Sequence, residues 1–174
     1  NKYPHVLVMT ATPIPRTLAM TAYGHLDVSV IDELPPNRKP VLTLHKYDKS
    51  IKEVHSFIHR ELNNGRQAYI VYPLIEESAA LDYKNLMDGY ETVKSIFKNS
   101  NFNISVMHGR LSKQDKQSEM DKFLNKETQI MVATTVIEVG VNVPNATIMV
   151  IQNAEKFGLS QLHQLRGRVG RGAD

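Results

Sequence analysis

The sequence contains no cysteine, so neither a disulfide framework nor a cysteine-based zinc site is possible. That absence fits the reducing cytoplasm, which is the location we expect. The sequence also has no apolar run long enough to cross a bilayer and no signal peptide, so no membrane partner is expected. Nowhere does it contain G-x-x-x-x-G-K-[ST], the loop that cradles the β-phosphate of a nucleotide.

The residues that are present are typical of a globular protein. The 174 residues are 41% hydrophobic and 22% charged, which is enough for one domain of ordinary size with a real core. The formal net charge of +3 permits a nucleic-acid partner but does not establish one.

Short apolar, β-branched runs alternate with amphipathic segments along the chain. We expect buried strands at 5–9, 28–31, 41–45, 68–72, 104–108, 129–133 and 147–151. Helices are expected at 50–62, 86–97 and 112–124, the first with Ile51, Val54, Phe57, Ile58 and Leu62 on one face. Ser112 and Asp115 resemble a capping box at a helix start. This alternation predicts an α/β fold with a parallel sheet covered by helices on both faces.

Proline marks the expected domain boundary. Pro35, Pro36 and Pro40 exclude a helix across 33–40, so we expect a linker there, between a segment at 1–32 and a compact α/β unit at 41–174. Residues 73–85 are expected to form an irregular surface insertion. Apparent motifs lie close to both ends of the sequence. We therefore expect that the sequence is a piece of a longer protein and that the unit at 41–174 ends before its last strand.

Arginine and glycine are crowded together near the end of the chain, in QLHQLRGRVGRG at 161–172. The arginine side chain is planar, permanently charged and bidentate toward phosphate oxygens, so this stretch suits an anion. A solvated basic loop and an RNA-binding patch are alternatives of equal standing on spacing alone. VSVIDEL at 28–34 looks like a Mg²⁺-binding strand end, but no phosphate loop precedes it, so Asp32 and Glu33 are expected to be solvated linker residues.

Ligands of open parallel sheets bind at the carboxyl ends of the strands. We therefore expect TATPIPR, HGR, TTVIEVGVNVP and the arginine stretch to lie along one edge. His108, Gly109 and Arg110 precede a helix start, which is a suitable seat for phosphate, although a lone histidine there is more often structural. The histidines show no spacing typical of metal ligands.

Three motifs together resemble those of superfamily 2 helicases. QLHQLRGRVGRG resembles motif VI, ATTVIEVGVNVPNA at 133–146 resembles motif V, and TAT at 10–12 resembles motif III. With PIPRTL at 13–18, the resemblance narrows to the branch of DNA translocases that contains the RecG and Mfd types. DVSVIDELPPNRKPV at 27–41 and AYIVYPLIEES at 68–78 favour the RecG type.

The resemblance implies a fold and a set of partners. Such enzymes carry two RecA-like domains with ATP and Mg²⁺ bound between them. This chain would supply the last strand and helix of the first domain, at 1–32, and most of the second. Its partners would be branched double-stranded DNA, such as forks and Holliday junctions, and the first RecA-like domain and wedge domain of the same chain. Alone it would be inactive and hold no cofactor.

The resemblance also implies residue roles in motif VI. Arg171 matches the arginine finger that stabilises charge on the γ-phosphate. Arg168 matches the second motif arginine, and Gln164 the polar partner that orients both. Gly167 and Gly170 complete the nucleotide-binding motif. Arg166 is equally compatible with a structural or a DNA-facing charge.

Motifs V and III supply the remaining candidates. Thr134 and Thr135 would bind a DNA phosphate, unless they only cap a helix, and His108, Gly109 and Arg110 would also contact DNA. Gly140 and Asn142 would face the nucleotide. The family usually has Asp where this chain has Asn142, so an ion pair between this position and motif VI lacks its negative charge. Coupling between the two sites would fall to Thr10, Ala11, Thr12, Arg16 and Glu138, with a simple capped turn as the alternative for the threonines.

Two other functions remain open from the sequence. One is an Mfd-type translocase that acts on stalled RNA polymerase, since both types share these motifs. The other is a non-catalytic α/β module that holds nucleic acid on its basic edge.

Overall fold

The computed structural model describes residues 40–74, 79–134 and 143–170, together with Leu7, Met9, Asp27, 29–31 and Glu33. The chain divides into two compact units, Asn1–Pro36 and Asn37–Asp174, and every element below belongs to the second. The strand predicted at 5–9 lies largely outside the described residues. The strand predicted at 28–31 was wrong, because residues 29–31 are described, form no strand and leave Val30 and Ile31 exposed. The domain boundaries proposed from the sequence stay predictions.

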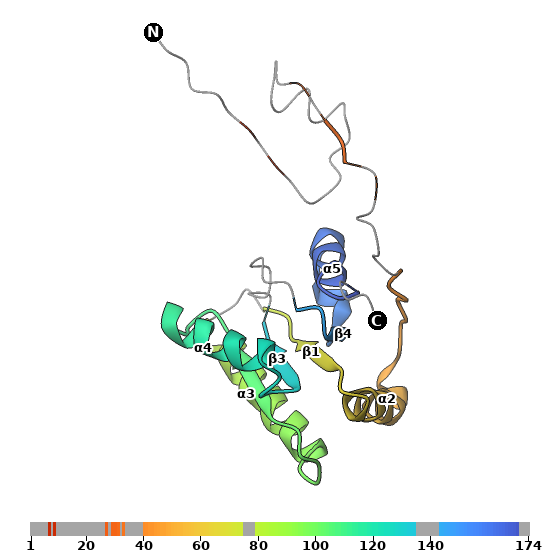
Figure 1. Ribbon diagram of the computed structural model, residues 1–174, viewed down its shortest axis with the longest axis vertical. Coiled ribbons are helices and arrows are strands. Elements are labelled where there is room, and N and C mark those ends of the chain that lie inside the picture. Colours follow the sequence, from red (N-terminus) through yellow and green to blue (C-terminus); the bar gives the residue numbers. More distant parts are fainter. Residues whose placement is uncertain are drawn as a thin grey trace. The chain divides into compact units, whose positions relative to one another are not determined.

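Four parallel strands form the centre of the second unit (Figure 1). They are β1 (Gln67–Val71), β2 (Ile104–Met107), β3 (Ile130–Ala133) and β4 (Ala146–Ile151). Their order in the sheet is β2-β3-β1-β4, and the three pairings are all parallel. The four strands coincide with predicted ones to within one residue at either end, and the predicted α/β class is confirmed.

Side chains alternate between two cores along every strand. On β1, Ala68 and Ile70 join one apolar cluster, whereas Tyr69 and Val71 join the other. All five residues of β1 are buried, because both faces of the strand are covered. This explains why its sequence is a continuous apolar run rather than an alternating one.

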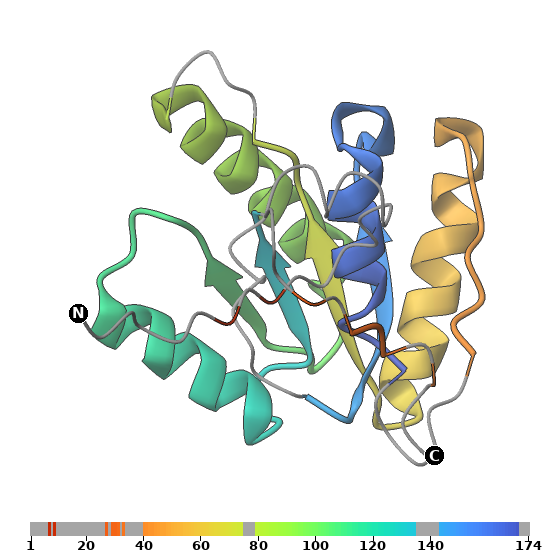
Figure 2. The same ribbon diagram turned by 90° about the horizontal axis from the view of Figure 1, so that it is seen from above.

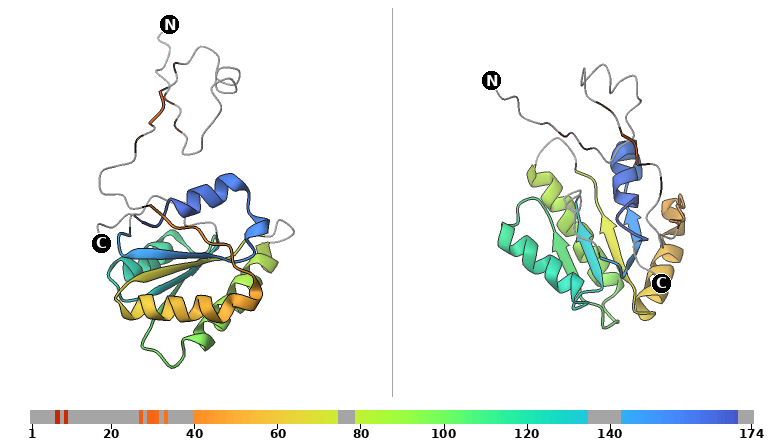
Figure 3. Two further views of the ribbon diagram at one scale, coloured as in Figure 1. Left: turned by 90° about the vertical axis from the view of Figure 1, so that its right-hand side faces the viewer. Right: turned by 45° about the horizontal axis from the view of Figure 1, so that its top comes forward.

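Four helices cover the sheet, two on each face. Ile58 and Leu62 of α2 (Ile51–Asn63) and Leu86 and Val93 of α3 (Ala79–Ile96) pack in the cluster with Ala68. The cluster on the other face contains Met120 and Phe123 of α4 (Lys113–Leu124) and Leu165 of α5 (Leu159–Arg166). Figure 3 shows α2 and α5 on opposite sides of the sheet. Two short 3-10 helices, η1 (Asp48–Ser50) and η3 (Ala154–Lys156), precede α2 and α5.

The predicted start of α4 is confirmed. The Ser112 hydroxyl accepts the Asp115 backbone N–H at 3.1 Å and donates to the Asp115 carboxylate at 2.7 Å. One of the four N–H groups that a helix start leaves without an internal partner is therefore satisfied.

Three structural predictions for the second unit were wrong. Residues 41–45 form no strand: β4 is the edge of the sheet, and Leu42 and Leu44 are exposed, because apolar content alone does not supply a hydrogen-bonded neighbour. Residues 79–85 belong to α3 rather than to an irregular insertion, since no glycine or proline interrupts the chain between Pro73 and Gly89. Phe57 is exposed instead of facing the core, and the Arg60 guanidinium lies 5.2 Å from the centre of its ring.

A buried amide ties the amino ends of three strands together. Gln67, which is 1% exposed, donates from Nε2 to the backbone carbonyls of Phe123 at 2.6 Å and Thr128 at 2.7 Å. Its Oε1 accepts a bond from Asn145 Nδ2 at 3.2 Å. The start of β1 is thereby connected to the end of α4, the turn before β3 and the turn before β4.

Candidate functional site

The carboxyl ends of the four strands lie in one row. Met107, Ala133, Val71 and Ile151 are register partners across the sheet. The next backbone N–H groups continue the ladder, with Thr134 N donating to Met107 O at 3.2 Å. The row brings His108 and Thr134, which are far apart in the sequence, to the ends of the adjacent strands β2 and β3, as predicted for two of the four segments.

Thr134 is almost completely buried and its hydroxyl has no partner. The residue is 3% exposed, and its Oγ1 forms no hydrogen bond within the described part of the chain. A buried hydroxyl without a partner costs free energy on the order of 1–3 kcal/mol. The Thr134 hydroxyl is therefore suited to bind a ligand that supplies the missing hydrogen bond. The alternative, that Thr134 caps a helix, concerns residues outside the described ranges.

His108 follows β2, and its surroundings disfavour the charged form of its ring. Burial, and to a smaller extent the charges of Arg110 and Lys116, lower its pKa below the ordinary 6.5. Its Nδ1 is buried and, among the described residues, has no hydrogen-bond partner. The ring packs edge-on against Tyr83 of α3, with 5.0 Å between ring centres.

Two cations flank this histidine. The Arg110 guanidinium lies over the Tyr83 ring, 5.2 Å from its centre. Lys116, on α4, donates from Nζ to the Gly109 carbonyl at 3.0 Å. The ion pairs found within the described ranges include neither of them. Both charges are therefore available to an anion, and we call His108, Gly109, Arg110, Lys116 and Thr134 the basic edge.

The arginine stretch begins at the end of α5. Leu165 and Val169 are buried in the core, which turns Arg166 outward and leaves Gln164 and Arg168 half-buried. Arg168 N donates to Leu165 O at 2.9 Å, so the helix closes in a turn. Gly170 has φ +73°, a left-handed conformation that favours glycine, whereas Gly167 is ordinary right-handed backbone.

The arginine stretch lies away from the carboxyl end of β4, the strand that precedes it (Figure 2 and Figure 3). Figures 2 and 3 show α5 running from the carboxyl end of β4 back alongside the sheet, antiparallel to the strands. The expectation of four segments along one edge was therefore wrong for this one, because the intervening helix carries the chain away from that edge.

Many predicted site residues lie outside the described ranges: Thr10, Ala11, Thr12, Arg16, Thr135, Glu138, Gly140, Asn142 and Arg171. Their roles stay predictions. Two residues of the site were missed from the sequence. Tyr83 falls in the stretch that was expected to be irregular, and Lys116 is recognisable only through its spacing from Ser112 along the helix.

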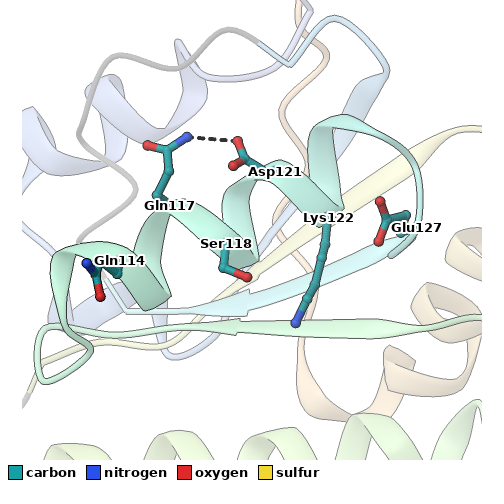
Figure 4. Close-up of a pocket in the computed structure, with 6 residues that line it drawn as sticks. All are labelled: Gln114, Gln117, Ser118, Asp121, Lys122 and Glu127. Carbon is teal, nitrogen blue, oxygen red and sulfur yellow. Dashed lines mark hydrogen bonds between the residues drawn. The ribbon is translucent and has the colours of Figure 1, made fainter.

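Two hollows on the second unit contain no member of the basic edge. The larger, about 490 Å³, is lined by polar side chains of α4 and by Glu127, and a Gln117–Asp121 hydrogen bond of 2.8 Å crosses one side of it (Figure 4). The smaller, about 270 Å³, lies between α2 and α3 above Ile70 and Tyr72. Burial raises the pKa of Tyr72 above its ordinary value.

Within the described ranges, no three His, Asp or Glu side chains lie close enough together to hold a metal ion. None of the helices in that part of the chain combines the length and apolarity needed to cross a membrane.

Comparison with known proteins gives a consistent result. The model of the helicase conserved C-terminal domain matches residues 46–173. The chain is 57% identical over 171 residues to the ATP-dependent DNA helicase RecG of Synechocystis sp., covering 98% of this chain and 20% of that protein. It is 56% identical over 169 residues to RecG of Bacillus subtilis, covering 97% and 25%.

A solved structure of RecG bound to a three-way DNA junction also matches. The TM-score is 0.76 at 49% sequence identity, over 93% of this chain and 21% of that one. The C-terminal part of the Fun30 ATPase domain shares the fold at 19% identity, with a TM-score of 0.51. The chain spans about a fifth to a quarter of the length of the RecG relatives it matches.

Proposed function

The chain belongs to the family of helicase conserved C-terminal domains, and from that premise we propose that it is the second RecA-like motor domain of an ATP-dependent DNA translocase of the RecG type. The complete protein would move on double-stranded DNA and remodel stalled replication forks and Holliday junctions in repair and recombination. An enzyme that acts on a bacterial chromosome would work in the cytoplasm.

One observation carries the proposal. The fold and sequence of this chain follow, over 93% of its length, those of a RecG structure that was solved on branched DNA. The RecG relatives favour this type over the Mfd type. A motor function is favoured over a passive binding module because Gln164, Arg168 and Gly170 stand in the helicase order at the end of α5.

The basic edge supplies the DNA side of the proposal. Arg110 and Lys116 bring two charges that no carboxylate of the described residues neutralises, and Thr134 brings an unpartnered hydroxyl. These groups contact the phosphate backbone rather than the bases, which suits a translocase that must bind every sequence. Thr135 would add a second hydroxyl beside Thr134.

The end of α5 supplies the nucleotide side. The buried neighbours Leu165 and Val169 fix the backbone around Arg168, from which its guanidinium would reach a phosphate. Arg171, just beyond the left-handed Gly170, would place a positive charge where negative charge develops on the γ-phosphate. Gln164 would orient both arginines, and Gly140 and Asn142 would line the nucleotide.

Bound ATP supplies the phosphoanhydride bond whose hydrolysis drives movement. The described residues contain no site that fits Mg²⁺, so that ion would be held elsewhere, by the first RecA-like domain. Residues of motif III (Thr10, Ala11, Thr12 and Arg16), with Glu138, would couple hydrolysis to movement. The wedge domain would engage the branch point.

The test uses the complete protein and a synthetic three-way junction. We expect junction-stimulated ATP hydrolysis, with kcat reduced about 10³-fold or more in Arg171→Ala while ATP still binds. Arg110→Ala should instead weaken junction binding. Arg60→Ala is the matched control, since Arg60 also lies 5.2 Å from an aromatic ring centre but on α2. Hydrolysis that is indifferent to DNA, or normal junction binding by Arg110→Ala, would refute the proposal.

A further inference from the structure

Tyr83 occupies a position that none of the helicase motifs includes. It lies on the first turns of α3 and meets the loop after β2 through two ring contacts. The Arg110 guanidinium lies over the ring, 5.2 Å from its centre, and the His108 ring meets it edge-on at 5.0 Å with an interplanar angle of 70°. One aromatic ring thus touches both side chains that follow β2.

We infer that Tyr83 is a positioning residue, whose ring holds Arg110 and His108 of the basic edge in the orientation that receives a DNA phosphate. The inference rests on the proposed function, because it presumes that Arg110 meets DNA. It adds a residue on a different helix, outside the loop itself, to the DNA-binding site.

Helix α3 holds the Tyr83 ring in a fixed position. Leu86, three residues further along the helix, is fully buried, and Gly89 allows the Tyr72 ring to pack directly against the helix backbone. The helix cannot shift along the sheet without disturbing these contacts. Tyr83 itself is 38% exposed, so its ring is fixed at one end by the helix and reaches the surface at the other.

Arg110 depends on this ring because nothing else described restrains it. It has no carboxylate partner among the described residues, and a free arginine loses considerable rotamer entropy when it binds. A cation over an aromatic face is attracted to it, which restricts the side chain before DNA arrives. An arginine side chain that is already ordered loses less entropy when it binds DNA, so the affinity for DNA is higher.

The ring, rather than the hydroxyl, makes these contacts. The hydrogen bonds found within the described ranges include none from the Tyr83 hydroxyl. Tyr83→Phe should therefore keep junction binding, whereas Tyr83→Leu, which retains apolar bulk but no aromatic face, should weaken it about two- to fivefold.

The chain provides a matched control. Tyr47 is also exposed, meets His45 edge-on at 4.8 Å and lies under Lys49 at 6.0 Å, but precedes η1. Tyr47→Leu removes the same kinds of contact and should leave junction binding unchanged. Thermal unfolding of each variant separates lost binding from lost stability.

The deciding experiment is a double-mutant cycle on junction binding by the complete protein at several salt concentrations. Arg110→Ala should reduce the slope of log K against log salt by about one, as for one lost phosphate contact. Tyr83→Leu should instead lower K at every salt concentration with the slope nearly unchanged, because it removes the ordering of Arg110 and not its charge. Tyr83→Leu should add nothing in the Arg110→Ala background. Additive effects, or unchanged affinity in Tyr83→Leu alone, overturn the role of Tyr83 and leave the proposed function standing. If Arg110→Ala itself binds normally, the DNA-binding edge and the inference both fall.

Discussion

Gln67→Glu is a nearly isosteric change that should destabilise the sheet severely. In the structure both amide hydrogens of Gln67 are used, on the Phe123 and Thr128 carbonyls at 2.6 and 2.7 Å. A carboxylate oxygen in place of that nitrogen would face two carbonyl oxygens at hydrogen-bonding distance. The site is 1% exposed, so water cannot relieve the repulsion.

The expected loss follows from the two hydrogen bonds. Leaving a buried acceptor without a donor costs about 1–3 kcal/mol, so two such losses give roughly 2–6 kcal/mol, a large part of a typical stability of 5–15 kcal/mol. A domain of this size should then melt about 4–24 °C lower. Gln67→Met, which removes the donors without adding a charge, should cost less than Gln67→Glu at neutral pH.

The pH dependence separates the two variants. Burial raises the pKa of a carboxyl group above the unfolded value of about 4.3, so the folded Gln67→Glu protein binds a proton more readily than the unfolded one. Its stability should therefore be greatest below about pH 4.3 and fall as the pH rises through the folded-state pKa. The proton can restore one of the two hydrogen bonds, which Gln67→Met cannot do.

Urea unfolding of the 174-residue chain, followed by circular dichroism from pH 4 to 8, is the assay. Gln117→Glu on the exposed face of α4 is the control, since it also replaces a bonded amide but should cost under about 1 kcal/mol. A loss below about 1 kcal/mol in Gln67→Glu at pH 7, or a loss that grows as the pH falls to 5, would show that the amide network does not support the sheet as described.

Three further predictions follow from other parts of the chain. Gly89→Ala should destabilise the protein by up to about 2 kcal/mol, measured by urea unfolding, although alanine favours helix, because the new Cβ would stand 2.7 and 2.8 Å from Tyr72 ring atoms. Burial lowers the folded-state pKa of His55 and His108 below 6.5, so the free energy of unfolding should decrease as the pH falls through 6.5 and stay flat above it. His108→Gln should reduce this dependence of the unfolding free energy on pH, and an unchanged dependence would contradict the burial argument. The 174-residue chain, which lacks a phosphate loop, should not hydrolyse ATP in a colorimetric phosphate assay with or without branched DNA, and turnover that disappears in Arg171→Ala would contradict this.

The fold was predictable where burial dictates the sequence. The runs at 68–72 and 129–133 are apolar on both faces, and only a covered parallel strand accommodates such a run. The run at 41–45 has similar composition but no neighbouring backbone to pair with, and composition contains no information about that neighbour. The early start of α3 was missed because Pro73 and the acidic residues after it suggested a loop, although the propensity of Ala79 and Ala80 favoured helix.

The candidate site was predictable only in part. Strand order and register bring His108 and Thr134 together, and the sequence predicted both as residues after strands. Tyr83 could not be inferred, because its contacts cross from α3 to the loop after β2 and depend on the angle between two elements. The place of the arginine stretch was predicted wrongly for a related reason: the sequence shows that it follows a strand but not where α5 carries it (Figure 2).

The sheet order has a consequence for how the protein is made. Among the four strands of the described sheet, β1 is the first to leave the ribosome, yet both of its neighbours, β3 and β4, follow α3, β2 and α4 in the chain. Until those strands emerge, the QAYIV segment, which is apolar from Ala68 to Val71, has two open edges. At synthesis rates of about 5–20 residues per second this interval lasts several seconds, far longer than collapse of the chain. The nascent protein therefore depends on shielding of β1 by α2 and α3, or by a chaperone, until β4 completes the sheet.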